Sequence, residues 1–65
     1  MSRNTVMLDD SLWVFDQINE DQVVSYKTSY LGKFIGEQEL MTPTQAISQI
    51  MWLAKSGYQV TTEVV

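Results

Sequence analysis

The chain has 65 residues, 45% of them hydrophobic, and its eight acidic and four basic side chains give a formal net charge of −4. This composition predicts one small folded domain, and the acidic balance argues against a protein that binds the nucleic-acid phosphate backbone directly. Cysteine and histidine are both absent, which excludes disulfides, zinc sites with nitrogen or sulfur ligands, and catalytic triads that need either residue. The apolar runs are too short to cross a bilayer and the N-terminus lacks the apolar segment of a signal peptide, so we expect a cytoplasmic protein without membrane contact.

The first part of the chain predicts a β-hairpin. Residues 1–10 mix polar and apolar types without a clear period, and we expect them to be a loose N-terminal lead-in. Residues 11–17 (SLWVFDQ) contain a continuous apolar run that predicts a strand covered on both faces. Residues 18–21 favour a turn, and the alternation in residues 22–31 predicts a second strand. In that strand one face carries Val24, Tyr26 and Thr28, and the other carries Val23, Ser25 and Lys27.

Two interpretations stay open for the next stretch. Gly32 and Lys33 could form a tight turn into a short strand over residues 34–40, or the glycines could mark a bulged or looping stretch with no strand. We favour the short strand. In an extended conformation Glu37 and Glu39 would share one face, where a partner's arginines could bind them.

The clearest pattern predicts a helix from about residue 43 to residue 55. Thr42 is suited to the N-cap, Pro43 to the first helical position, and Gln45 to the third position of a capping box. A lysine and then a glycine at the far end are typical stop signals. The alternation in residues 58–65 predicts a final strand.

These elements combine into an α+β fold. We expect a small antiparallel sheet of three to four strands with one helix packed on one face, in the order ββ(β)αβ, and residues 1–65 forming a single domain. The helix is the only element available to cover an apolar face of the sheet.

A projection at about 100° per residue sorts the helix into two faces. The predicted core face comprises Ile47, Ile50, Met51 and Ala54, flanked by Ala46 and Leu53. Trp52 falls roughly 140° from Ile47, among polar residues. Three interpretations stay open. The N-terminal ten residues, with Val6, Met7 and Leu8, could fold back over the ring, or the helix could start in another register. Alternatively, the indole belongs to a surface that docks a partner, because tryptophan is enriched among residues that dominate binding energy. The candidate partner-binding residues are Trp52, Gln45, Ser48 and Gln49 on the outer helix face, with Glu37 and Glu39 beside them.

No pattern in the sequence predicts catalysis or a cofactor. The neighbouring acids Asp9 and Asp10, and Glu20 and Asp21, lie in expected loops or turns without the spacing of a calcium site. The glycines do not match the pattern of a phosphate-binding loop. We therefore expect a non-enzyme that binds no metal and no cofactor.

Residues 42–61 resemble the second half of a small phage-encoded family of inhibitors of bacterial RNA polymerase. The matching residues are Thr42, Ala46, Trp52 and the run Gly57-Tyr58-Gln59-Val60-Thr61, after an opening strand that also carries a tryptophan, Trp13. This sequence is one residue shorter between Trp52 and Gly57, and Thr62 and its neighbours include none of the arginines with which the family contacts polymerase. The resemblance therefore implies a phage-encoded binding protein without implying polymerase as its target.

The sequence favours a small acidic protein-binding module that inhibits or modulates a host protein machine of transcription or defence, in the host cytoplasm, by binding a basic patch. One alternative is a structural homo-oligomer, such as a homodimer, assembled through the edge strand 58–65 or the Trp52 face. Another is a nucleic-acid mimic that blocks a DNA-binding enzyme.

Overall fold

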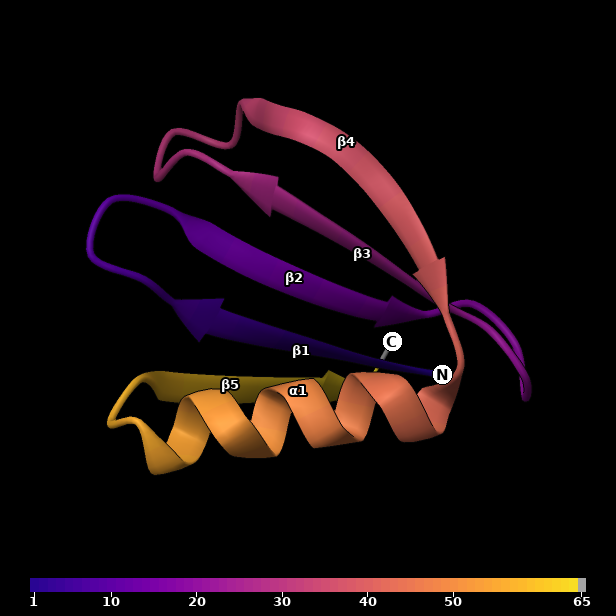
Figure 1. Ribbon diagram of the computed structural model, residues 1–65. Coiled ribbons are helices and arrows are strands. Elements are labelled where there is room, and N and C mark those ends of the chain that lie inside the picture. Colours follow the sequence, from indigo (N-terminus) through magenta and orange to yellow (C-terminus); the bar gives the residue numbers. More distant parts are fainter. Residues whose placement is uncertain (65) are drawn as a thin grey trace.

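The computed structural model describes residues 1–64 (Figure 1). The strands are β1 (Ser2–Met7), β2 (Leu12–Gln17), β3 (Val23–Thr28), β4 (Phe34–Met41) and β5 (Gln59–Val64), and the helix is α1 (Pro43–Lys55). All neighbouring strands pair antiparallel, in the spatial order β4, β3, β2, β1, β5. The α+β class with a single helix is therefore confirmed for residues 1–64, but the sheet has five strands, and the element order is ββββαβ.

The additional strand is β1, so the prediction of a loose lead-in over residues 1–10 is wrong. β1 lies inside the sheet and pairs with both β2 and β5. The sequence of β1 shows no clear alternation of polar and apolar residues, because some of its inward-facing positions carry polar side chains that bond to neighbouring strands. The Asn4 side chain accepts a hydrogen bond from the Thr62 hydroxyl at 2.7 Å, and Arg3 forms a 3.2 Å salt bridge with Asp16.

The region of residues 32–40 combines the two interpretations. β4 is a strand of eight residues, and its pairing with β3 shifts between Ser25 and Lys27, which marks a bulge. Gly36 lies at this irregularity with a φ of 74°, a conformation that favours glycine.

The helix begins and ends where the sequence predicts. The Thr42 hydroxyl accepts a hydrogen bond from the Gln45 backbone N–H, and the Gln45 side chain accepts one from the Thr42 N–H, so the capping box is complete. Gly57 follows the helix with a φ of 97°, as expected of a glycine that ends a helix.

The core lies between α1 and one face of the sheet. Its buried side chains are Val6, Phe15, Val23, Ala46 and Leu53. The predicted core face of the helix is confirmed for Ile50 and for the flanking Ala46 and Leu53, but it is wrong for Ile47 and Met51, which are 57% and 55% exposed. Ala46 and Leu53 lie at the centre of the buried stripe. The helix is therefore rotated about its own axis by roughly 90° from the predicted orientation.

The second face of the sheet has no helix on it. The strand register places a group of apolar side chains there, on β2, β3 and β4: Leu12, Val14, Val24, Tyr26, Phe34 and Leu40. The prediction that residues 11–17 are covered on both faces is therefore wrong, since α1 packs only on the Trp13 and Phe15 side. Val14 is still only 6% exposed, because its neighbours on the same face shield it.

Candidate partner-binding groove

A groove runs between α1 and the β3–β4 half of the sheet. α1 contacts β1, β3 and β5, and Figure 1 shows it in front of the β5 side of the sheet, with β4 curving away and returning to the start of the helix. The space left between them has a volume of about 910 Å³, and we call it the α1–β4 groove. Its lining includes Thr44, Gln45, Ser48 and Gln49 from α1, Ile35, Glu37, Glu39 and Met41 from β4, and Trp13, Ser25 and Lys27 from β2 and β3.

The strand register explains why these side chains meet. Trp13 lies opposite Lys27, and Lys27 lies opposite Ile35, so the three form a row across β2, β3 and β4. Ser25 lies opposite Glu39 in the next row on the same face. Side chains in directly opposed positions point to the same face of a sheet, which here is the face that carries α1.

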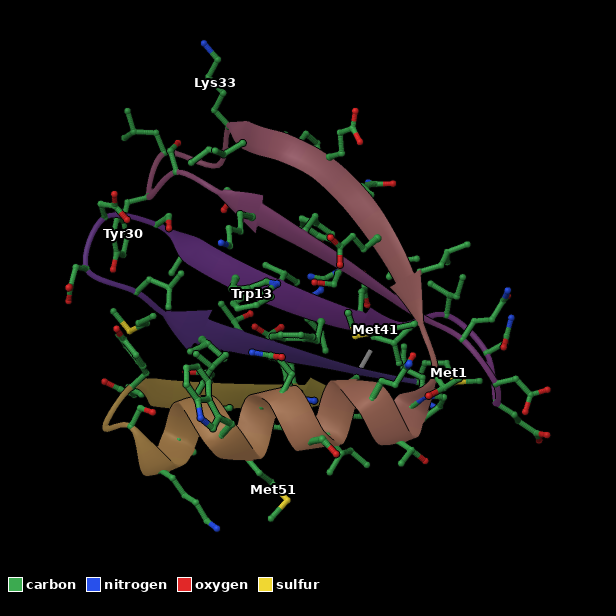
Figure 2. All side chains as sticks on the ribbon, viewed as in Figure 1. Met1, Trp13, Tyr30, Lys33, Met41 and Met51 are labelled. Carbon is green, nitrogen blue, oxygen red and sulfur yellow. The ribbon has the colours of Figure 1, made fainter. Side chains whose placement is uncertain are left out.

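The floor of the groove is an indole held in a fixed position. The Trp13 Nε1–H donates a hydrogen bond of 2.6 Å to the Ser25 hydroxyl, and Ser25 is only 3% exposed. The Trp13 ring also stacks on Phe15, with ring centroids 5.1 Å apart. The Lys27 ammonium lies 4.7 Å from the centroid of the Trp13 ring, a cation–π arrangement. Figure 2 shows Trp13 over the middle of the sheet.

The β4 wall of the groove is acidic. Glu37 and Glu39 are both exposed, and among residues 1–64 neither carboxylate forms a salt bridge or a side-chain hydrogen bond. The charged residues of the lining are these two acids and Lys27, whose ammonium already lies over Trp13. The β4 wall can therefore accept a cation or hydrogen-bond donors from a bound molecule.

Five of the six predicted partner-binding residues lie together in this groove: Gln45, Ser48, Gln49, Glu37 and Glu39. Gln45 also serves the capping box, so its side-chain oxygen is already engaged with the Thr42 N–H.

The sixth residue, Trp52, does not line the groove. It follows Ser48 and Gln49 by one helical turn, at spacings of four and three residues, so it continues the same helix surface beyond the groove lining. The indole is 61% exposed, as the projection predicts. The alternative that residues 6–8 cover it is wrong, because Val6 and Leu8 pack into the core.

The sequence reasoning missed the floor of the groove. The sequence predicts only that residues 11–17, which include Trp13, form a covered strand and that Ser25 and Lys27 share a strand face. The signal was present, because two polar residues on the face opposite Val24, Tyr26 and Thr28 are unusual under a packed helix.

Two features that indicate other kinds of protein are absent from residues 1–64. No group of three or more acidic side chains in this part of the chain is arranged to hold a metal ion, and none of its helices has the length and apolar character needed to cross a membrane. No protein-family model matches the chain, and comparisons with curated proteins and with solved structures give no significant match. The function is therefore inferred from the groove and its chemistry.

Proposed function

We propose that this chain is a small acidic protein-binding module that acts as a phage-encoded inhibitor or modulator of a host protein machine of transcription or defence. Its binding surface is the α1–β4 groove together with Trp52. The observation that best supports this proposal is the groove itself, in which a fixed indole lies beside two carboxylates without partners. An ordered aromatic surface with a few convergent polar groups is typical of a binding site.

The groove chemistry favours a basic partner segment. The indole of Trp13 and the side chains of Ile35 and Met41 offer apolar contact, while Glu37 and Glu39 offer acceptors to an arginine or lysine. We therefore expect a segment with an apolar anchor and a basic residue close to it in space. The exposed Trp52 indole would pack against the same partner just outside the groove.

Binding suits these residues better than catalysis does. Ser25, the serine at the floor of the groove, already accepts a hydrogen bond from Trp13, and no hydrogen bond joins its hydroxyl to a carboxylate. The activated nucleophiles of enzymes need such a base within hydrogen-bond reach.

A selection from a library of random displayed peptides tests the groove chemistry. We expect the wild-type chain to enrich peptides that combine an apolar residue with arginine or lysine, and Glu37→Gln/Glu39→Gln to lose this enrichment. The control is Glu20→Gln/Asp21→Asn, which removes the same charge from an exposed turn. Equal enrichment by both double variants, or no enrichment by the wild type, would show that the groove is not the binding surface.

Affinity capture from a bacterial lysate tests the host partner. We expect the wild-type chain to retain one protein that is recovered less well with Trp52→Ala and with Glu37→Gln/Glu39→Gln. Equal recovery by all three chains would contradict the assigned surface. Capture of a DNA-binding enzyme that dissociates steeply with added salt would instead support the nucleic-acid mimic.

A further inference from the structure

The two edges of the sheet differ in how readily they can pair with another strand. β4, at one edge, contains the bulge at Gly36 and the acids Glu37 and Glu39, features with which natural proteins discourage edge pairing. β5, at the other edge, is paired with β1 over six consecutive residues without a register shift. Its central residues are β-branched, and Glu63 is its one charged residue among positions 59–64. The β5 edge is therefore regular and open to a further strand.

An apolar flank of α1 lies on the same side of the molecule as this edge. Ile47 and Met51 are one helical turn apart and both more than half exposed. They lie on the flank of α1 opposite Gln49, which faces the groove. Figure 2 shows Met51 pointing away from α1 on the side opposite β4.

We propose that a second copy of this chain pairs with β5 across a two-fold axis, so that the two sheets join and the two α1 helices pack along Ile47 and Met51. An antiparallel strand edge is self-complementary under such an axis. With the axis at Thr62, directly opposed side chains point to the same face and Glu63 of one copy faces Thr61 of the other, so no like charges oppose each other.

The dimensions of the two layers agree with this arrangement. Neighbouring strands lie about 4.8 Å apart, and α1 contacts β5 in each copy, so joining the two β5 edges places the helices on the same face of the combined sheet, one on each side of the two-fold axis. Packed helices are separated by about 8–10 Å. β5 and α1 also have matching lengths of about 20 Å each. The strand pairing and the helix contact can therefore form together.

The proposed contact area is small, which limits the affinity of the dimer. One strand edge and one helix flank of this length give an interface at the low end of specific complexes, below about 1,200 Å² in total. We expect a reversible dimer with a dissociation constant on the order of 10 µM.

Sedimentation equilibrium from about 1 to about 500 µM measures this dissociation constant for the wild type and two matched variants. Met51→Glu places a charge in the helix contact, twice per dimer, and we expect it to raise the dissociation constant at least about tenfold. It also stands four residues before Lys55, so it should not weaken the helix. Gln49→Glu introduces the same charge on the groove flank and should leave the dimer intact. Circular dichroism verifies that both variants are folded.

Amide chemical shifts locate the contact in the wild-type chain. With increasing concentration we expect changes in β5 and around Ile47 and Met51, and none in β4. A wild type that stays monomeric, a dimer equally stable in Met51→Glu, or shift changes centred on β4 would overturn the proposal. This result is independent of the proposed function, because peptide selection on Met51→Glu tests the groove in a chain designed not to pair.

Discussion

The hydrogen bond between Trp13 and Ser25 should make a measurable contribution to stability, and it can be tested by removing each partner. Ser25→Ala leaves the indole N–H without an acceptor, and an unsatisfied buried donor costs about 1–3 kcal/mol. Since Trp13 lines an open groove that water can enter, we expect the lower half of this range, about 1–2 kcal/mol. A chain of 65 residues has a total stability of roughly 3–10 kcal/mol, so this loss is a large fraction.

Urea unfolding followed by circular dichroism gives the free energies for a double-mutant cycle. Trp13→Phe removes the donor but keeps an aromatic ring, and it leaves the almost fully buried Ser25 hydroxyl without its partner. The double variant should lose less than the sum of the two single losses, with a coupling energy of about 1 kcal/mol. Ser48→Ala, at an exposed serine of α1, should change stability by no more than about 0.5 kcal/mol. Strictly additive losses, or a Ser25→Ala cost equal to that of the control, would refute the structural role of this bond.

Three further predictions concern the core, the helix start and the salt bridge. Leu53→Ala should lower the free energy of unfolding by about 2–5 kcal/mol, whereas Met51→Ala in dilute solution should change it by no more than about 0.5 kcal/mol; urea unfolding of both verifies the helix orientation. Thr42→Ala should cost about 1 kcal/mol in the same assay, because the capping box is lost. The pKa of Arg3 is raised above its ordinary value by its hydrogen bond to Asp16 and by the charge of that carboxylate. A raised pKa contributes stability that is complete below the ordinary value and is lost only in stronger alkali, so the stability difference between wild type and Arg3→Gln should stay constant from about pH 6 to about pH 9.

The helix bounds were predictable because they depend on local interactions. The capping hydrogen bonds join residues only three positions apart, and the glycine that ends the helix acts within its own turn. The hairpin of β2 and β3 was predictable for the same reason, since a short turn and an alternating pattern specify it. The orientation of α1 about its axis was not predictable in this way. It depends on which sheet residues lie beneath the helix, and these come from strands far away in the sequence.

β1 shows how favourable tertiary interactions can hide a strand in the sequence. Its alternating positions include polar side chains on the face toward α1, and a pattern of hydrophobicity alone cannot detect these. Asn4 is acceptable there because Thr62, 58 positions later, donates a hydrogen bond to it. Such a partner becomes visible only when β1 is placed beside β5.

Because β1 was not predicted, the sequence revealed only part of the candidate site. A helix is about 10 Å wide and strands are about 4.8 Å apart, so one helix covers about two strands. Over the predicted sheet of three to four strands, α1 would have left less space, and Trp13 was expected in a covered strand. Over five strands, the same helix packs toward the β5 side and leaves the β3–β4 half open, so that Trp13 becomes the floor of a groove and Glu37 and Glu39 become its wall. The helix residues could be selected by their exposure alone, whereas the residues facing them depend on the number of strands in the sheet.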